Sequence, residues 1–554
     1  MRTWLLSSFV ICILATTSIT AEEKNFTSLC NSAMDLYYKH EFDKAIELYK
    51  KALSMKPEST PVHFNIGYIF SILKKTNSAI KHLQLALQGN PCYTKAHFIL
   101  AQIFLEEKKD IEQAMHHYKK TIELDPHHFD ATFRLGQLYY EQDNWNKAQK
   151  LFEKTVQLKP KSIIVRFDLA SLFLKQHNFD AAIEQYKKIL KINPSSAVTN
   201  YNMAYALKLK GAYQESIPYY KKAIKLNPKN EKATFGYAKS SLAMGYFEQG
   251  WKAFEYRMAS QEKYRKTFNF HGIQPDEFKN KTVLIRAEFG LGDTIHFIRY
   301  AQLVKKCGAK KVYVETFGPL VQLLSNCNYI DKAFAKKTPL PRHDIQIPLL
   351  SFPMIFDTRL NTVPQTIPYI NADKKLIRLW KNKLNTINSN PNQLNVGLCW
   401  QANPNTFLED NPLTKRSIPL SLFEPLTQLK NVKLYSLQRQ YGADQINNLP
   451  DGFFIHDFGP DFDTTHGRFM DTAAVISNLD LVITVDTAIA HLSGALGTQT
   501  WILLPSVAEW RWMTDGTTTP WYPQARLFRQ QTHDDWKSVI NEIADEIRCI
   551  SKTR

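Results

Sequence analysis

One stretch near the C-terminus combines a strand, a carboxylate and a helix start in the order that an anion-binding site requires. Residues 482–485 are apolar and mostly β-branched, which indicates a buried strand that ends at Asp486, and the small residues after it predict a helix. Because a helix N-terminus offers backbone N–H groups and the positive end of the helix dipole, a phosphate or diphosphate is the expected ligand. Ala490 and Gly494 lie on one face, so this helix can approach the sheet or a ligand closely. The alternative for this stretch alone is an ordinary βα unit without a ligand.

A similar strand, turn and helix occur earlier in the chain. Residues 283–286 predict a strand, and Gly290, Gly292 and Asp293 follow in a short turn before an amphipathic helix at 295–301. Two glycines allow a tight turn and a close approach of a ligand to the backbone. The spacing is neither that of a dinucleotide-binding fingerprint nor that of a P-loop, so this turn alone is a weak signal.

Both arrangements lie in a part of the chain, from Lys281 on, where short apolar runs alternate with helical segments. Such alternation predicts parallel, doubly wound sheets. An Asn-rich stretch at 384–392 is the expected joint between two halves, residues 281–390 and residues 393–550. The predicted strands are 283–286, 312–315 and 345–347 in the first half, and 395–399, 432–436, 453–455, 481–485 and 500–504 in the second.

The preceding part of the chain has a regular period. Proline recurs every 34 or 35 residues, with a small residue twelve positions and a bulky apolar residue eight positions before it, at Pro57, Pro91, Pro126, Pro160, Pro194 and Pro228. This pattern resembles the tetratricopeptide repeat and implies six repeats and a degenerate seventh within residues 26–260. Such an array forms a concave surface for a peptide, protein or other extended partner, whereas the aromatic stripe is expected to be core. An extra residue near 108–110 is expected in a turn, and the histidines at 116–117 and 127–128 on exposed faces.

Composition bounds the possible partners and compartments. The 554 residues carry a net charge of +18, but the lysines are spread over the repeats, which argues against nucleic-acid binding. Residues 1–21 combine Arg2, an apolar stretch and a small-residue end, which predicts a signal peptide or, as the lesser alternative, an N-terminal membrane anchor. The seven cysteines have the spacing of neither a disulfide framework nor a zinc site.

Taken together, the 290–293 turn and the 486–497 stretch resemble the heptosyltransferase-related glycosyltransferases of GT-B fold. The resemblance covers residues 283–536 and includes Trp400-Gln401, Lys415-Arg416-Ser417, Ser436-Leu-Gln438, Asp471-Thr-Ala-Ala474, Trp510-Arg511-Trp512 and Trp521-Tyr-Pro523. The whole chain is similar in architecture to bacterial proteins that join tetratricopeptide repeats to such a domain, relatives of the O-linked N-acetylglucosamine transferases. This implies an α solenoid followed by an α/β GT-B fold of two Rossmann-like halves.

The function that the resemblance implies is inverting transfer of a sugar from a nucleotide sugar to a protein or glycan acceptor held by the repeats. The donor is a substrate, and neither a cofactor nor a metal is expected, although Asp461 and Asp463 form an Asp-x-Asp pair in a loop. Asp293 is the candidate general base. The alternative is that it caps its helix, since a helix N-terminus should lower its pKa.

The remaining assignments concern the donor. Asp486, Thr487 and Ala488 would form the diphosphate seat, with His491 one turn further along the helix and able to donate to a phosphate or the sugar. A carboxylate repels phosphate, so Asp486 is expected to cap the helix or to bond a sugar hydroxyl. Three further assignments follow from the resemblance. Lys415 or Arg416 would neutralise the leaving group, and the alternative is that the pair forms an exposed basic turn. Gln438 would contact the nucleotide, and Trp510 to Trp512 would either border the cleft or pack in the core.

Two other classes of function stay open. One is an interaction scaffold whose glycosyltransferase-like domain is inactive, and the other is an exported binding protein that uses only its repeats. Location separates these hypotheses, because the N-terminal segment suggests export or membrane attachment, whereas the supply of nucleotide sugars suggests the cytoplasm.

Overall fold

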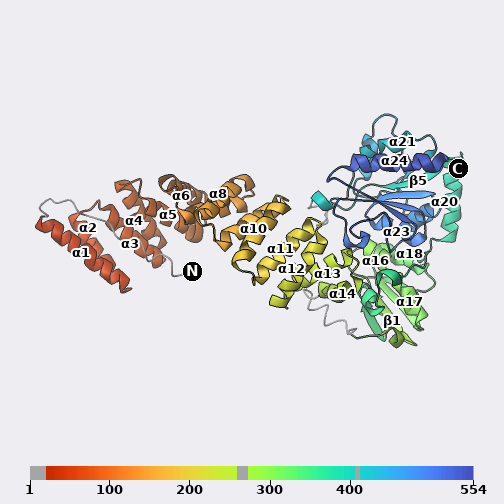
Figure 1. Ribbon diagram of the computed structural model, residues 1–554, viewed down its shortest axis with the longest axis horizontal. Helices are drawn as coiled ribbons and strands as arrows, with labels where there is room; N and C mark the ends of the chain where they lie inside the picture. The colour runs from red at the N-terminus through yellow and green to blue at the C-terminus, as the bar shows by residue number, and fades with distance from the viewer. Residues whose placement is uncertain (1–19, 259–271, 389, 391, 406–411, 553–554) are drawn as a thin grey trace. The chain divides into compact units, whose positions relative to one another are not determined.

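The computed structural model describes residues 20–258, 272–388, 390, 392–405 and 412–552 (Figure 1). The chain forms two compact units, one up to Leu172 and one from Phe173 on. The predicted signal peptide or anchor at 1–21 lies almost wholly outside the described residues. Among the helices that are described, none combines the length and the apolarity needed to cross a membrane.

The first unit consists of antiparallel helix pairs. Each predicted repeat supplies two helices, and their bounds are α1 (Ala21–Tyr38), α2 (Phe42–Met55), α3 (Thr60–Ile72), α4 (Thr76–Gly89), α5 (Thr94–Ile103), α6 (Ile111–Leu124), α7 (Phe129–Glu141), α8 (Trp145–Leu158) and most of α9 (Ile163–Lys175).

The repeat signature is buried in both units. The six small residues twelve positions before each proline are 0% exposed, and the six bulky residues eight positions before it are at most 1% exposed. Gly67 shows why small residues recur, since a Cβ there would lie 2.8 Å from Cγ of Leu83. The prediction that the aromatic stripe is core is therefore confirmed.

The extra residue of the third repeat is absorbed at a helix end. A single π-helical turn, Phe104–Lys108, continues α5, and Lys109 follows in the left-handed region with φ of 57°. The extra residue is thus accommodated by the π-helical turn at the end of the helix, next to the loop in which it was predicted.

Two histidine pairs repeat in successive repeats. His63 Nε2 donates to the carbonyl oxygen of Pro57 at 2.8 Å, so its Nδ1 accepts from His82 Nδ1 at 3.1 Å. His97 and His117 form the equivalent pair at 2.9 Å. The prediction that His117 lies on an exposed face is therefore wrong, because the ring is half-buried against His97 and Phe104 of the first helix in its own pair.

The second unit begins with the remaining repeats. Their helices are α10 (Phe179–Ile192), α11 (Ala197–Leu209), α12 (Tyr213–Leu226), α13 (Glu231–Ala243) and α14 (Phe247–Phe254), followed by the short 3-10 helix η2 (Glu255–Met258). The predicted end of the array at residue 260 lies outside the described residues.

Two parallel sheets follow, as predicted. The first has the order β3-β2-β1-β4, with β1 (Thr282–Arg286), β2 (Lys311–Thr316), β3 (Lys332–Ala335) and β4 (Ile345–Pro348). The second has the order β6-β5-β7-β8-β9, with β5 (Leu394–Cys399), β6 (Val432–Ser436), β7 (Leu481–Val485), β8 (Thr500–Leu504) and β9 (Ala525–Arg529). All neighbouring strands pair in parallel, with Val283 opposite Val312 and Val396 opposite Leu481.

Three details of the strand prediction need correction. The edge strands β3 and β9 were not predicted, because Lys332, Arg526 and Arg529 interrupt their apolar patterns. The predicted strand at 453–455 does not form, and only an isolated bridge joins His456 to Tyr435. The Asn-rich joint begins as the last turn of α20 (Lys374–Ile387).

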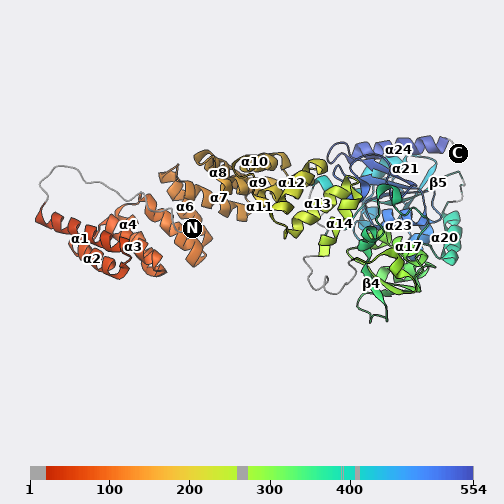
Figure 2. The ribbon, with the colours of Figure 1, turned by 60° about the horizontal axis from the view of Figure 1, so that its bottom comes forward.

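Helices cover both faces of the second sheet. On one face, α21 (Glu424–Thr427) and α24 (Trp536–Lys552) pack on alternate residues of β5, β7 and β8 (Figures 1 and 2). On the other face, α22 (Met470–Ile476) and α23 (Ala488–Leu496) share a core with the first sheet and with α14. The last repeat and the two sheets are therefore built on one core.

Tryptophans make this shared core. Trp251 of α14 packs edge-on against Trp510 at 5.4 Å between ring centres, and Phe247 stacks on Trp521 at 5.8 Å. Tyr213 of α12 adds a hydrogen bond to the carbonyl oxygen of Ala508 at 2.9 Å. At the predicted boundary the chain thus changes from repeat helices to alternating strands and helices, and both parts pack on one hydrophobic core.

The predicted helix at 295–301 is interrupted. It forms as α16 (Leu291–Phe297) and α17 (Tyr300–Lys306), with Arg299 between them and only 1% exposed. The guanidinium donates to the carbonyl oxygen of Trp521 at 2.7 Å and to Oη of Tyr369 at 2.9 Å. These distant partners explain the break, since a buried cation must find acceptors.

Candidate functional site

A cavity of about 880 Å³ lies at the carboxyl ends of β1 and β7, where α16 and α23 begin. This is the edge at which open α/β sheets bind ligands. The walls come from both sheets and from the last repeats. The polar lining residues are Tyr205, Lys208, Lys239, Asp293, Gln401, Asn403, Arg416, Gln438, Arg439, Gln440, Tyr441, Asp463, Arg468, Thr472, Asp486, Thr487, His491, Glu509 and Arg511.

The glycine turn brings Asp293 to this cavity. Gly290 is the N-cap of α16, and its N–H donates to Asp293 Oδ2 at 3.0 Å. The left-handed residue of the turn is Phe289, with φ of 49°, so the tight turn predicted for the glycines falls on their neighbour. Phe289 is 55% exposed and lines the cavity.

Gly292 lies where the two halves of the α/β domain pack on each other, which leaves little room for a side chain. A Cβ on Gly292 would lie 3.0 Å from Cδ2 of His491 and 3.6 Å from Cα of Ala488. The glycine thus permits close packing of α16 on α23. The structure therefore brings together the two motifs that the sequence places far apart.

His491 is held from three sides. Its Nδ1 shares a hydrogen bond of 2.9 Å with Tyr522 Oη, and its ring stacks between His296 and Trp512 at centroid distances of 5.0 and 5.3 Å. Burial and the nearby arginines hold the pKa of His491 well below its usual range, so the imidazole is neutral. Gly494, expected to face the sheet or a ligand, lies instead under Tyr522, where a Cβ would be 2.4 Å from the ring.

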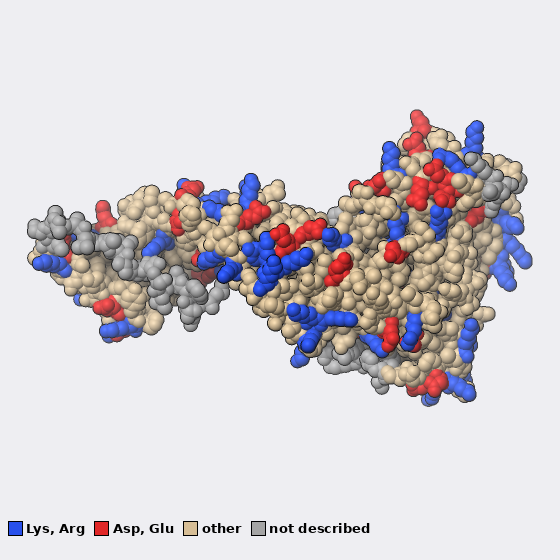
Figure 3. Space-filling view, in the orientation of Figure 1, with Lys and Arg blue, Asp and Glu red and all other residues tan. Residues whose placement is uncertain are grey.

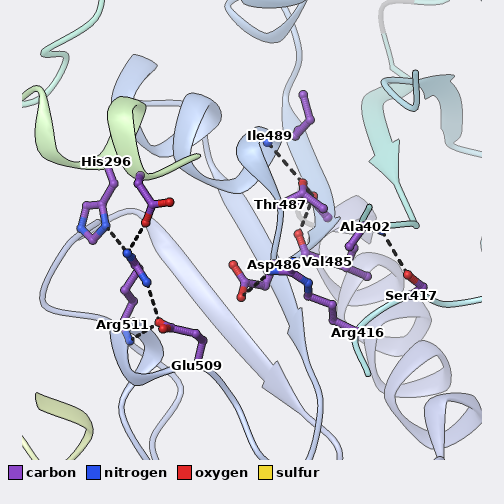
Figure 4. Close-up of polar contacts among 12 residues, drawn as sticks. His296, Ala402, Arg416, Ser417, Val485, Asp486, Thr487, Ile489, Glu509 and Arg511 are labelled. Carbon is purple, nitrogen blue, oxygen red and sulfur yellow. Dashed lines mark hydrogen bonds and ion pairs between the residues drawn. The ribbon is translucent and has the colours of Figure 1, made fainter. Parts of the chain in front are cut away.

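Arg511 links the acidic residues beside the turn. It forms an ion pair with Asp293, a second with Glu509 at 2.7 Å, and donates from Nε to His296 Nδ1 at 3.2 Å (Figure 4). Burial raises the pKa of Asp293 despite the Arg511 charge and the Gly290 N–H. The predicted lowering of the Asp293 pKa by its helix is therefore wrong, because desolvation outweighs the dipole. The alternative that Asp293 caps its helix is confirmed, and capping does not exclude a second role.

The predicted diphosphate seat has a different internal arrangement. Thr487, not Asp486, caps α23, because its hydroxyl accepts from Ile489 N at 3.2 Å. Asp486 instead pairs with Arg416 at 3.3 Å, and burial raises the pKa of its carboxyl (Figure 4). Of the two basic candidates, Arg416 lines the cavity, whereas Lys415 is exposed and is not among its lining residues. The expectation that Asp486 caps the helix is wrong.

Gln438 shapes the cavity wall. Its Oε1 accepts from Trp400 N at 3.0 Å and Gln401 N at 2.9 Å, and its Nε2 donates to the carbonyl oxygens of Gln401 and Tyr441 at 3.0 and 2.8 Å. Both amide hydrogens are thus in use, so the predicted nucleotide contact would have no free donor from this side chain. Asp463, of the Asp-x-Asp pair, accepts from Thr472 N at 2.9 Å at the start of α22.

Several lining residues were missed by sequence reasoning. Glu509 is adjacent to a noted Trp-Arg-Trp motif, but its ion pair with Arg511 depends on the turn between them. Lys208 and Lys239 belong to repeats and look like any other repeat lysine in sequence. Over the part of the chain that the structure describes, no three His, Cys, Asp or Glu side chains are grouped to hold a metal ion.

Surface charge is mixed. On the face drawn in Figure 3, basic and acidic side chains are interspersed over the repeats and over the α/β domain. Lys and Arg side chains on that face lie over several repeats and over the α/β domain, with acidic side chains beside them.

The fold and these repeats define a tetratricopeptide-repeat protein whose array is followed by an α/β domain with two parallel sheets. Two family models match the repeats: the C-terminal ARM domain of tetratricopeptide repeat protein 21 over residues 13–203, and the tetratricopeptide repeat over residues 197–230. These matches agree with the period of the prolines.

Among curated proteins, the chain is 23% identical over 336 residues to Protein FlbA of Caulobacter vibrioides, covering 57% of this chain and 54% of FlbA. It is 28% identical over 135 residues to a tetratricopeptide repeat protein 21 homolog of Caenorhabditis briggsae, covering 24% of this chain and 10% of that protein. It is also 26% identical over 97 residues to Protein O-mannosyl-transferase Tmtc3 of Drosophila melanogaster, covering 18% of this chain and 10% of that protein. The chain thus spans about half the length of FlbA and a tenth of the other two.

Two solved structures each match about a third of this chain. YrrB, a repeat protein with an unusual peptide-binding site, has 18% identity and a TM-score of 0.31 over 33% of this chain and 95% of its own. MamA has 24% identity and a TM-score of 0.29 over 31% of this chain and 94% of its own. The repeat assignment itself rests on the sequence period and the family models.

Proposed function

We propose that this chain is an inverting, metal-independent glycosyltransferase that moves a sugar from a nucleotide sugar to a protein or glycan acceptor held by the repeats. The observation that carries the proposal is the meeting of two helix starts at one cavity. The start of α16 presents Asp293, and the start of α23 presents Thr487 and Ala488 beside Arg416. The candidate base and the candidate anion seat thus line one cavity, which supports the proposal.

These residues suit an in-line displacement. The acceptor hydroxyl oxygen would attack the anomeric carbon, the bond from that carbon to the diphosphate would break, and Asp293 would take the hydroxyl proton. A raised pKa makes Asp293 a better base than an exposed aspartate. The departing diphosphate would lie at the start of α23, where the helix dipole and Arg416 stabilise negative charge.

The ion pairs in the cavity add one requirement. Arg416 is paired with Asp486, so a diphosphate would have to compete with that carboxylate for the guanidinium. Asp293 likewise shares its charge with Arg511. In the proposed reaction, protonation of Asp293 would leave Arg511 with Glu509 as its anionic partner.

The same pairs favour a second candidate, a repeat-based interaction scaffold with an inactive glycosyltransferase-like domain. Arg416 and Asp293 both have partners within the chain, as they would in a domain that binds no donor. Tetratricopeptide arrays bind proteins, which either candidate requires. One relative is named a protein O-mannosyl-transferase, in keeping with sugar transfer to protein, but the chain covers only 10% of it.

The test is a panel of UDP-, ADP- and GDP-sugars offered to the full chain, with binding measured by calorimetry and sugar release by chromatography. The parent should bind and slowly hydrolyse at least one donor. Asp293→Asn, which keeps an acceptor for Gly290 N–H, should bind the donor but lose at least about 100-fold in hydrolysis. A parent that binds no donor would refute the enzymatic proposal in favour of the scaffold.

A matched control addresses the capping role of Asp293. Glu277 accepts from Gln274 N at 2.8 Å in a similar capping arrangement outside the cavity. Glu277→Gln should leave hydrolysis unchanged. Because Asp293→Asn keeps the cap, equal losses in both variants would mean that removing a carboxylate charge beside a helix start lowers hydrolysis without any role for Asp293 in proton transfer.

A further inference from the structure

One aromatic residue that lines the cavity has a strained backbone. Phe289 has φ of 49°, in the left-handed region that suits glycine, and a bulky residue occupies that region only at a cost in free energy. The preceding residue, Glu288, accepts from Arg257 Nη2 at 2.9 Å and from its Nε at 3.2 Å. The following residue, Gly290, donates its N–H to Asp293 Oδ2 at 3.0 Å. Contacts on both sides thus keep Phe289 in this conformation.

The ring of Phe289 gains little from packing. The residue is 55% exposed, and in the part of the chain that the structure describes no aromatic ring stacks on it and no cation lies over it. Other rings of the cavity differ, since Lys208 Nζ lies 5.1 Å from the centre of the Tyr205 ring. Lys239 Nζ likewise lies 4.8 Å from the centre of the Phe235 ring. A residue that is strained and packs poorly indicates a role other than stability, and its place in the cavity makes that role contact with a ligand.

The lining residues of the cavity divide by chemistry. The arginines all come from the half of the α/β domain after residue 393: Arg416, Arg439, Arg468 and Arg511. The repeats and the first half supply aromatic residues, together with two lysines: Tyr205, Phe235, Phe254, Phe289, Lys208 and Lys239. Phe235 and Phe254 lie 5.4 Å apart between ring centres. An anionic donor suits the arginines, so the aromatic residues are left for the acceptor.

We propose that Phe289 binds an aromatic side chain of the acceptor protein, next to the serine or threonine that receives the sugar. The inference rests on the proposed transferase function and names its acceptor class, a polypeptide with an aromatic residue adjacent to the modified hydroxyl. Phe289 is assigned to the acceptor because it belongs to the same turn as Asp293, the proposed base. Pairing of two aromatic rings would give this contact its selectivity.

Two observations favour a polypeptide over a glycan. The repeats supply the other aromatic residues of this group, and such repeats bind polypeptides. Among the described lining residues from the repeats and the first half, none is Asn or Gln, whose side chains could both donate to and accept from sugar hydroxyls.

The test is a binding experiment with the full chain that requires no turnover. Arrayed 15-residue peptides carry a central serine or threonine, flanked at each adjacent position by Phe or by Gln. The parent should bind Phe-flanked peptides about tenfold more tightly, as expected for burial and pairing of one ring. Phe289→Gly should abolish the preference, whereas Phe289→Tyr, which retains a ring, should keep it.

The glycine variant also separates ligand contact from a structural role. Because glycine adopts the left-handed region without strain, the urea midpoint of Phe289→Gly should equal or exceed that of the parent. A lower midpoint would overturn the inference, since the ring would then serve packing. Phe454→Ala is the matched control, because Phe454 is 80% exposed and is not a lining residue, and this variant should keep the preference.

Three binding results would also overturn the inference. They are equal binding of Phe- and Gln-flanked peptides by the parent, a preference that survives in Phe289→Gly, and an equal loss in Phe454→Ala. Oligosaccharides on an array that bind the parent and lose affinity in Phe289→Gly, with peptide binding unchanged, would assign the ring to a glycan instead.

The outcomes distinguish this inference from the proposed function. Peptide preference without binding of any nucleotide sugar refutes only the transferase. Hydrolysis of a donor without peptide preference refutes only the acceptor assignment. Loss of donor binding in Phe289→Gly, with peptide preference unchanged, assigns the ring to the donor and overturns the inference.

Discussion

Replacing Gly292 by alanine would drive a methyl group into the contact that joins the two halves of the α/β domain. The new Cβ would lie 3.0 Å from Cδ2 of His491, closer than van der Waals contact allows. His491 cannot turn away, because Tyr522 holds its Nδ1 and the rings of His296 and Trp512 lie on either side. Helix α16 must therefore move away from α23 by a few tenths of an ångström.

The cost can be bounded. Overpacking a close-packed contact costs about 1–3 kcal/mol. Alanine regains part of this through its helix propensity, about 1 kcal/mol in a helix interior and less in the first turn, where Gly292 lies. We expect a net destabilisation of about 1–2 kcal/mol, which lowers a urea midpoint by roughly 0.5 M when the slope is near 3 kcal/mol/M.

Tryptophan fluorescence is the assay of choice. Of the ten tryptophans, all except Trp4 and Trp145 lie after Leu172, so the signal reports the unit that contains Gly292. Gly318→Ala is the matched control, since its Cβ would meet nothing within 4 Å. Urea midpoints that coincide for Gly292→Ala, Gly318→Ala and the parent would refute the close-packing argument.

Three other changes test features described above. Gln438→Met leaves Trp400 N and Gln401 N without their acceptor and should cost about 2–4 kcal/mol of unfolding free energy. An unchanged urea midpoint would mean that these hydrogen bonds do not stabilise the fold. Arg299→Met removes the donors to the buried carbonyl oxygens of His296 and Trp521 and should cost a similar amount, with Arg299→Lys recovering little because one ammonium cannot reach all partners. Burial and the partner histidines lower the pKa of His82 and of His117 to about 4. Between pH 6.5 and pH 4 these two histidines are therefore protonated in the unfolded chain and still neutral in the folded chain, so acid favours unfolding. Stability should be constant above pH 6.5 and fall from 6.5 towards 4 in circular-dichroism melts, and replacing both histidines by glutamine should flatten that fall.

The fold was predictable where a pattern repeats or a strand is buried on both faces. The proline period indicated the first six repeats, and continuous apolar runs such as 482–485 indicated the central strands. Two of the four edge strands, β3 and β9, escaped prediction because charged residues interrupt their apolar patterns, as Arg526 and Arg529 do in β9. The break at Arg299 was equally hidden, since its partners Tyr369 and Trp521 are tens to hundreds of residues away.

The site was predictable in its location and not in its pairings. Both motifs reach one cavity, as the resemblance implied, but which carboxylate meets which arginine depends on tertiary distances. Asp293 meets Arg511 and Asp486 meets Arg416, and no local pattern contains either pair. Lys208 was invisible for a different reason, because a lysine in a repeat is an ordinary surface residue until another domain is folded against it.

The packing of Trp251 and Phe247 on Trp510 and Trp521 determines which repeats are interchangeable. Grafting a foreign array in place of all the repeats, up to the end of α14, would remove Trp251 and Phe247 and expose Trp510 and Trp521 in the core of the α/β domain. A graft made at or before Leu172 leaves the second unit whole, including the lysines that line its cavity. The repeats up to Leu172 can therefore be exchanged by recombination, whereas the repeats from Phe173 on must stay with the α/β domain on which they pack.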